Sequence, residues 1–135
     1  MKKTILLIFS LIVLITAVAF ADLTIQYFTG KSTQDGILLE WKTGDEGGTS
    51  YFQIERSANN PNNFIYLYTI NATGNNSFYS YLDNSLMRMS GSSIYYYRLK
   101  CVKPGGSYVY SNTITVVHSV SGIKDTWGSI KAIFR

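Results

Sequence analysis

The sequence has little from which a catalytic or metal site could be built. Its 135 residues include one cysteine and one histidine. A single cysteine cannot form an internal disulfide, so we expect packing alone to stabilise the fold. A serine or cysteine triad needs a histidine base, and the sequence has no Gly-x-Ser-x-Gly turn. We expect His118 to be a solvated residue at a strand end, and we predict no enzyme activity, cofactor or metal.

Charge is also sparse and poorly segregated. The chain has 12 Lys and Arg against 8 Asp and Glu, and two of the basic residues, Lys2 and Lys3, belong to an N-terminal segment. Excluding Lys2 and Lys3 leaves ten basic residues (12 − 2) against eight acidic residues, which is a net charge of +2. This charge is too weak and scattered to indicate nucleic-acid binding. Asp45 and Glu46 are too few for calcium, which needs six to eight oxygens, so we expect the loop Gly44–Ser50 to be solvated.

The N-terminus is typical of a secretory signal peptide. After Lys2 and Lys3 comes an apolar run, Ile5–Phe20, and then Ala19-Phe20-Ala21, a pattern that signal peptidase accepts. The alternative is an uncleaved anchor, but this run is shorter than the roughly 20 residues that cross a bilayer. We predict a signal peptide at residues 1–21, a domain at 22–118 and a tail at 119–135. The chain is then exported to the periplasm, the cell surface or the medium.

Short alternating segments separated by turns make up the predicted domain. Ile94–Val102 is the most regular, with Tyr95, Tyr97, Leu99 and Cys101 on one side and Tyr96, Arg98, Lys100 and Val102 on the other. This period of two predicts a central strand with one buried face. The other predicted strands are Leu23–Phe28 (ended by Gly30), Ile37–Thr43, Tyr51–Ser57, Phe64–Ile70, Phe78–Leu82 and Tyr108–Val117. Seven such strands, without a sustained helical period before residue 122, predict an all-β antiparallel sandwich.

The alternation also predicts which side chains build the core. Ile37, Leu39 and Trp41 should point inward from one strand, and Phe52 and Ile54 from the next. Cys101 should fill a core position as a small apolar side chain, unreactive in the folded state. Turn signals at Gln34-Asp35-Gly36 and Pro104-Gly105-Gly106 separate neighbouring strands.

Residues 23–117 resemble the fibronectin type III fold. Three features carry the likeness: Trp41 ends the strand Ile37-Leu-Leu-Glu-Trp41, Tyr95 opens the long strand where that family has its tyrosine corner, and Tyr110–Val116 matches the closing strand. The likeness implies a seven-stranded, immunoglobulin-like sandwich in which the Tyr95 hydroxyl holds the corner. Tyr51–Ser57 and Tyr96–Lys100, together with Gly106–Asn112, also resemble modules that precede sorting domains in large secreted proteins of gliding bacteria that use type 9 secretion. Those modules are mostly spacers or adhesive units.

All eleven tyrosines lie after the predicted signal peptide. Tyr66 and Tyr68 share one face of a predicted strand, and Tyr96 points away from the core if Tyr95 and Tyr97 are buried. Aromatic rings with a polar tip are enriched in contact surfaces, which favours a binding role. The ordinary alternative is that tyrosine suits the outer face of any sheet. Sugar stacking and protein binding are both compatible with this pattern.

The tail after Ser121-Gly122 combines apolar and basic residues. A helical spacing relates Ile123, Trp127, Ile130 and Phe134. The last residues also alternate as in an added strand, with Ile130, Ala132 and Phe134 on one side and Lys131, Ile133 and Arg135 on the other. The tail either docks on a partner or folds back on its own domain. As docking residues we predict Trp127, Ile130, Ile133 and Phe134.

Together these features predict an exported, non-catalytic binding or adhesion module. It would present Tyr66, Tyr68, Tyr96 and the tail to a cell-envelope or extracellular protein, and we expect no nucleic-acid partner. The membrane would be met only during export, through the signal peptide. One alternative is a subunit of a surface assembly or filament, in which the tail docks on the next copy. Another is a carbohydrate-binding module.

Overall fold

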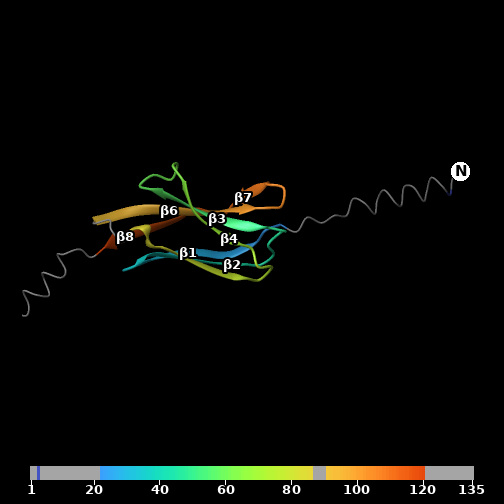
Figure 1. Ribbon diagram of the computed structural model, residues 1–135, viewed down its shortest axis with the longest axis horizontal. Helices are drawn as coiled ribbons and strands as arrows, with labels where there is room; N and C mark the ends of the chain where they lie inside the picture. The colour runs from blue at the N-terminus through green and yellow to red at the C-terminus, as the bar shows by residue number, and fades with distance from the viewer. Residues whose placement is uncertain (1–2, 4–21, 87–90, 121–135) are drawn as a thin grey trace, which may run out of the picture.

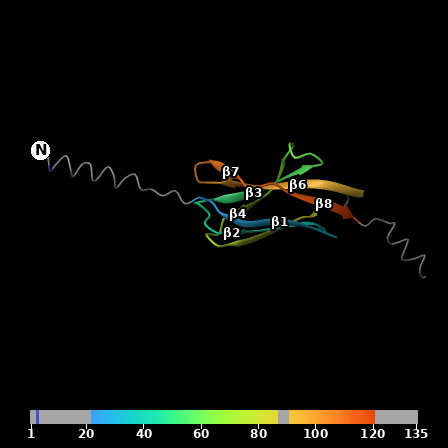
Figure 2. The ribbon, with the colours of Figure 1, turned by 180° about the vertical axis from the view of Figure 1, so that it is seen from behind.

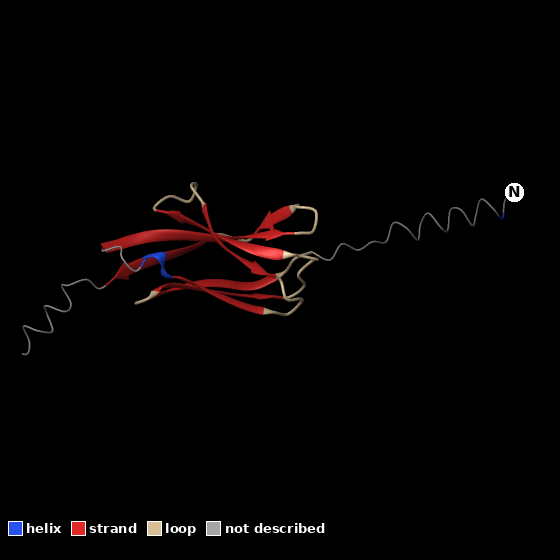
Figure 3. Ribbon diagram, in the orientation of Figure 1, coloured by secondary structure: helices blue, strands red, loops and turns tan. Residues whose placement is uncertain are grey.

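The computed structural model describes Lys3, residues 22–86 and residues 91–120. Strands account for almost all the regular structure of this part (Figure 3). They are β1 (Ile25–Thr33), β2 (Gly36–Thr43), β3 (Tyr51–Ala58), β4 (Ile65–Asn71), β5 (Phe78–Asp83), β6 (Gly91–Val102), β7 (Tyr108–Tyr110) and β8 (Ile114–Val120), with the 3-10 turn η1 (Asn84–Leu86) before β6. No helix within these residues is long and apolar enough to cross a membrane.

The strands form two antiparallel sheets packed face to face, as Figures 1 and 2 show from opposite sides. The three-stranded sheet has the order β1-β2-β5. The five-stranded sheet has the order β4-β3-β6-β7, and β8 also pairs with β6. The predicted all-β antiparallel sandwich is therefore confirmed, with β6 as its central strand.

The core lies between the sheets and has the predicted phase. Ile37, Leu39 and Trp41 of β2 have no exposed surface, and neither do Phe52 and Ile54 of β3. The Trp41 ring packs against three aromatic rings. It stacks on Tyr79 with 5.2 Å between ring centroids, and it meets Phe28 and Phe52 edge-on at 6.3 and 5.9 Å. Such aromatic pairs add to the free energy gained by burying the rings.

The turn between β1 and β2 shows why its glycine is needed. Gly36 has a φ of 139°, and a Cβ placed there would lie 2.0 Å from the carbonyl oxygen of Asp83. Only a residue without a side chain fits this backbone and this contact. The sequence Gln34-Asp35-Gly36 thus forms the predicted turn.

Two strand predictions need correction. The described residues contain eight strands rather than seven, because the predicted strand Tyr108–Val117 is broken at residues 111–113 into β7 and β8. β1 does not end at Gly30 but continues to Thr33. Gly30 lies where β1 crosses β8, and a Cβ there would be 2.5 Å from Val116 Cγ2. The glycine therefore permits a close approach between the two sheets rather than ending a strand.

Candidate binding surface

Alternate residues of β6 point out of the sandwich and begin an exposed polar and aromatic surface. Tyr97, Leu99 and Cys101 have no exposed surface, so the side chains between them, Arg98 and Lys100, lie on the outer face of the five-stranded sheet. The register carries this face across the neighbouring strands, since Arg98 is opposite Glu55 of β3, and Lys100 is opposite Tyr110 of β7.

The hairpin after β6 brings two more tyrosines onto this face. Backbone hydrogen bonds from Lys103 N to Ser107 O (2.8 Å) and from Gly106 N to Lys103 O (3.0 Å) close the turn. The closed turn sets Val102 opposite Tyr108 and Lys100 opposite Tyr110. Tyr108 is 50% exposed and Tyr110 is 43% exposed, and their rings meet edge-on at 5.3 Å.

Arg98 contacts several other side chains of this surface. Its guanidinium lies 4.0 Å from the centre of the Phe64 ring and 3.8 Å from that of Tyr110, so it sits between two aromatic rings. Its Nε also donates to Glu55 Oε2 over 2.8 Å. An arginine held by two rings and a carboxylate loses little further side-chain entropy when a partner arrives. The arrangement is therefore preorganised.

Lys100 carries the second cation of the surface. Its Nζ lies 4.2 Å from the centre of the Tyr108 ring. We call the surface formed by these outward side chains the cation–tyrosine face. Its members are Phe64, Tyr66, Tyr96, Arg98, Lys100, Tyr108 and Tyr110. A hollow of about 350 Å³ adjoins it at Tyr110, with Asp22 and Lys103 among its lining residues.

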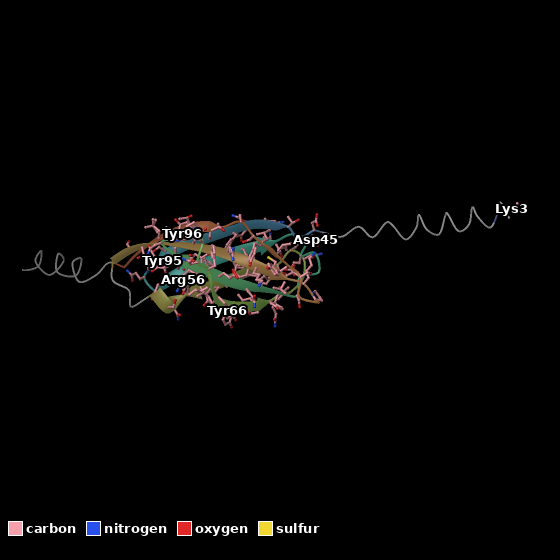
Figure 4. The ribbon with its side chains drawn as sticks, turned by 90° about the horizontal axis from the view of Figure 1, so that it is seen from above. Lys3, Asp45, Arg56, Tyr66, Tyr95 and Tyr96 are labelled. Atoms are coloured by element: carbon pink, nitrogen blue, oxygen red, sulfur yellow. The ribbon has the colours of Figure 1, made fainter. Side chains whose placement is uncertain are left out.

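Two of the three predicted contact tyrosines of the domain, Tyr66 and Tyr96, lie on the outer face of the five-stranded sheet. Tyr66 is 58% exposed, and its hydroxyl lies 3.0 Å from Thr69 Oγ1. Tyr96 is half-buried on the same outer face. Figure 4, which looks onto the five-stranded sheet, places Tyr66 at one margin of the molecule and Tyr96 towards the other. Contacts from these two tyrosines would therefore fall on separate parts of the face.

Tyr68 does not share a face with Tyr66, contrary to the prediction. Tyr66 pairs with Glu55 and Tyr68 with Ile54, so Leu67 is an extra residue that forms a β-bulge. Ile54 is buried, and its partner Tyr68 turns to the inner side of the sheet. There the Tyr68 ring stacks on Tyr81 of β5, with 5.2 Å between ring centroids.

The predicted docking residues of the tail, Trp127, Ile130, Ile133 and Phe134, lie outside the described residues, as does the predicted signal peptide apart from Lys3. Sequence reasoning did not single out Phe64, Tyr108 or Tyr110 as surface residues. For the two tyrosines a signal was present. A hairpin turn centred on Gly105 pairs residues that are equally far from Gly105 on either side, so Tyr110 lies beside the outward Lys100.

Asp83 is buried at the end of the sandwich where β5 meets η1. Its carboxylate accepts hydrogen bonds from Arg56 (2.6 Å), Tyr97 (2.8 Å) and Ser85 (2.6 Å), and it is 1% exposed. Burial by itself raises the pKa of Asp83, but the hydrogen bonds from Ser85, Arg56 and Tyr97 outweigh it and hold the pKa below its usual value. Burial and the charge of Asp83 together raise the pKa of Tyr97. Arg56, Ser85 and Tyr97 all donate to the Asp83 carboxylate, so we assign this cluster a structural role.

Glu46 was expected in a solvated loop, yet it is only 3% exposed. Its carboxylate accepts hydrogen bonds from the hydroxyls of Tyr79 and Thr43 and from the Gly74 N–H. The side chain therefore joins the loop 44–50 to the loop 72–77. Asp45 behaves as predicted and remains exposed.

The prediction that His118 is solvated is wrong, because its side chain is only 2% exposed. β8 runs three residues beyond the predicted strand end and turns His118 inward, where its Nδ1 lies 2.8 Å from Ser32 Oγ. Tyr95 is 3% exposed, as predicted, and its ring lies 6.4 Å from His118. The role of the Tyr95 hydroxyl stays a prediction.

Cys101 is fully buried, as predicted. Burial, with a smaller contribution from the charge of Glu46, raises the pKa of the Cys101 thiol to about 12. A thiol with this pKa is a poor nucleophile at neutral pH. Within the part of the chain that the structure describes, no three His, Cys, Asp or Glu residues are grouped to hold a metal ion.

No family model matches the sequence, and no curated protein matches it. Two crystal structures of pectate lyase PelI from Erwinia chrysanthemi are similar to this chain, one of them in complex with tetragalacturonic acid. Their TM-scores are 0.47 and 0.49 at 18% and 20% identity, over 71% of this chain. The chain spans 28% and 27% of the length of the two pectate lyase chains. We draw no functional argument from a likeness at this level.

Proposed function

We propose that this protein is an exported binding or adhesion module without catalytic activity, and that it binds a protein of the cell envelope or the extracellular space. The contact surface is the cation–tyrosine face, extended by the C-terminal tail. The predicted export signal and the resemblance of the sequence to fibronectin type III modules support this location and role. So does the all-β sandwich, which offers a rigid scaffold.

The observation that carries the proposal is the position of Arg98 between Phe64 and Tyr110. Tyrosine, phenylalanine and arginine are the residue types enriched in protein interfaces, and a few such residues supply most of the binding energy. Here Arg98 and Tyr110 project from the paired strands β6 and β7, Phe64 lies just before β4, and both rings contact Arg98. An ordinary solvated sheet face does not require cations fixed over its rings.

The same geometry favours a protein over a sugar. A sugar binds an aromatic side chain through the open face of its ring. Cations lie over the rings of Phe64, Tyr108 and Tyr110, so each of these rings already has one face occupied. Tyr66 and Tyr96 lie towards opposite margins (Figure 4) and do not form one platform.

The interior supports the absence of catalysis. Asp83 and Glu46 are engaged with fixed donors, His118 is buried, and burial holds the Cys101 thiol protonated. Each of these four side chains is at most 3% exposed. A catalytic acid, base or nucleophile needs access to substrate, which these positions do not give.

Site-specific photo-crosslinking in the cells that make the protein tests the proposal. A photoreactive phenylalanine analogue would replace Tyr110 or Tyr96 on the cation–tyrosine face. The matched control is Tyr27, a 40% exposed tyrosine on the outer face of the three-stranded sheet. We expect discrete protein adducts from Tyr110 and Tyr96 and none from Tyr27. Equal adducts at all three positions, or adducts at Tyr27 alone, would contradict the assignment of the face.

A further inference from the structure

The two arginines among the described residues use their guanidinium groups differently. Arg56 is enclosed, because its Nη1 donates to Asp83 Oδ2 over 2.6 Å and to Ser85 Oγ over 2.7 Å, and its side chain is 14% exposed. Arg98 donates through Nε, to Glu55 Oε2, and its side chain is 25% exposed. No described residue accepts a hydrogen bond from Arg98 Nη1 or Nη2. The end of the Arg98 guanidinium is therefore open to an acceptor from another molecule.

The neighbours of Arg98 leave one edge of its guanidinium for that acceptor. The rings of Phe64 and Tyr110 lie against the group, with their centres 4.0 and 3.8 Å from it. Glu55 takes the edge that carries Nε. The two terminal nitrogens remain, and they form a planar fork. Such a fork matches the two oxygens of a carboxylate, which it binds with a specific geometry.

Lys100 places a second cation beside this fork. Arg98 and Lys100 are two residues apart and both face outward on β6, so their Cα atoms are about 7 Å apart. The Lys100 Nζ is held 4.2 Å from the centre of the Tyr108 ring, and within the described residues it has no ion pair. Alternate side chains of any extended segment repeat at the same interval of about 7 Å. Two acidic residues at alternate positions of such a segment therefore match Arg98 and Lys100.

The charge of this face also favours an acidic partner. The outward charged side chains of the described strands in the five-stranded sheet are Arg98, Lys100 and Glu55, an excess of one cation. The adjoining hollow adds one charge of each sign, from Asp22 and Lys103. Since Glu55 is already paired with Arg98, the unpaired charge of the face is positive. A negatively charged partner is therefore complementary to it.

Charge alone does not distinguish this face from the outer face of the three-stranded sheet, which has Lys31 and Lys42 against Glu40. The difference is that neither of those lysines is ion-paired or held over a ring within the described residues. A cation that is already held in place loses less side-chain entropy on binding than one that moves freely. The fixed cations therefore select the cation–tyrosine face.

We propose that the cation–tyrosine face binds an extended acidic segment of its protein partner. One carboxylate of the segment pairs with the terminal nitrogens of Arg98, and a second, two residues along, pairs with Lys100. The inference rests on the proposed function and adds the chemistry of the partner. Aspartate and glutamate supply these carboxylates, and the rings of Phe64, Tyr108 and Tyr110 hold the two cations ready for them.

Binding of fluorescein-labelled poly-L-glutamate to the purified protein, followed by fluorescence anisotropy at low ionic strength, tests this chemistry. Lys100→Gln removes one cation of the proposed site. The matched control, Lys42→Gln, removes the same charge from the outer face of the other sheet. We expect Lys100→Gln to weaken binding by about three- to fivefold and Lys42→Gln to leave it nearly unchanged. Urea denaturation verifies that both variants are folded.

Arg98→Lys separates the geometry of the fork from its charge. This variant keeps the positive charge but loses the planar pair of donors, so we expect weaker binding than in the wild type. Binding equal to that of the wild type would show that the fork is not used, and would overturn the inference. Added sodium chloride should weaken the binding of every variant, because the contacts are between exposed charges.

Three further results would overturn the inference. Poly-L-glutamate does not bind the wild type, or Lys100→Gln and Lys42→Gln weaken it equally, so that binding follows net charge alone. In the third, dextran sulfate depends on Lys100 and poly-L-glutamate does not, which would assign the site to a sulfated polysaccharide. The proposed function has its own test, since protein adducts from Tyr110 in the photo-crosslinking experiment would stand even where this inference fails.

Discussion

The two faces of the five-stranded sheet are built from the same strands but have opposite character. On β6 the inward side chains Tyr97, Leu99 and Cys101 are fully buried, while Arg98 and Lys100 between them hold exposed tyrosines. The inner face determines whether the chain folds. The outer face contributes little to the core and is available to a partner. Substitutions one residue apart should therefore have unrelated effects.

Thiol reactivity should show the largest contrast between the two faces. Cys101 can react only when the core opens, which costs most of a stability of about 5–15 kcal/mol. A cysteine introduced by Lys100→Cys, in a Cys101→Ala background, would lie on the outer face. We expect the wild-type thiol to react more than about a thousandfold more slowly with a maleimide reagent. Comparable rates would place Cys101 outside the core and reverse the alternation of β6.

Removal of a core ring should have the next largest effect. Trp41→Ala deletes a fully buried ring that contacts Phe28, Phe52 and Tyr79. We expect it to lower the free energy of unfolding by about 3–5 kcal/mol. Lys42→Ala, one residue along and facing outward, should change it by less than about 0.5 kcal/mol. Urea denaturation followed by circular dichroism measures both, and equal losses would disprove the phase assigned to β2.

A buried ion pair should matter more than its exposed counterpart. Asp83→Asn leaves Arg56 without its carboxylate and should cost about 3 kcal/mol. Glu55→Gln, which breaks the partly exposed pair with Arg98, should cost less than about 1 kcal/mol. Denaturation midpoints of the two variants give the comparison directly. If Glu55→Gln proves the more damaging, the outer face contributes more to stability than this account allows.

Asp83 also predicts how stability depends on pH. Its pKa is lower in the folded than in the unfolded chain, where a carboxyl group has a pKa of about 3.9. Its contribution is therefore complete above the unfolded pKa and is lost as the pH falls through the folded pKa. The wild type should lose stability below about pH 4, and Asp83→Asn should lose less of its own over the same interval. If the free energies of unfolding of the two proteins fell in parallel with pH, the hydrogen bonds to Asp83 would not stabilise its charged form.

Loss of an aromatic ring from the outer face should have only a small effect on stability. Tyr110→Ser removes one of the two rings that hold Arg98, but it buries no new polar group and opens no core cavity. We expect the free energy of unfolding to change by less than about 1 kcal/mol. Urea denaturation of this variant beside Tyr27→Ser, its match on the other sheet, measures the difference. A loss comparable to that of Trp41→Ala would show that the face serves the fold.

Alternation in the sequence predicted most of the inner face. Most buried positions of β2, β3 and β6 follow a period of two, because one side of each strand meets the opposing sheet, but the buried Ser57 and Val102 depart from it. Three features depend on local geometry that composition does not encode. Leu67 adds a bulge that separates Tyr66 from Tyr68, Gly30 extends β1 past the expected end, and residues 111–113 split the last strand.

The candidate surface was only partly predictable. Tyr96 and Tyr66 follow from the phase of their strands, but the position of Arg98 between two rings depends on the pairing of β7 with β6 and on the path of the chain before β4. The polarity of a residue was also a misleading guide to its exposure. Glu46 and His118 looked solvated by type, yet hydroxyl and backbone donors from distant segments allow Glu46 to be buried, and a longer β8 buries His118.

Affinity capture with matched surface variants tests the central claim most directly. Tagged wild type, Tyr110→Ser and Tyr27→Ser would each be incubated with the cell-envelope fraction of the producing cells, and retained proteins quantified by mass spectrometry. We expect at least one protein that the wild type and Tyr27→Ser retain and Tyr110→Ser loses, with free energies of unfolding of the three that agree within about 1 kcal/mol. Identical sets of retained proteins would contradict it.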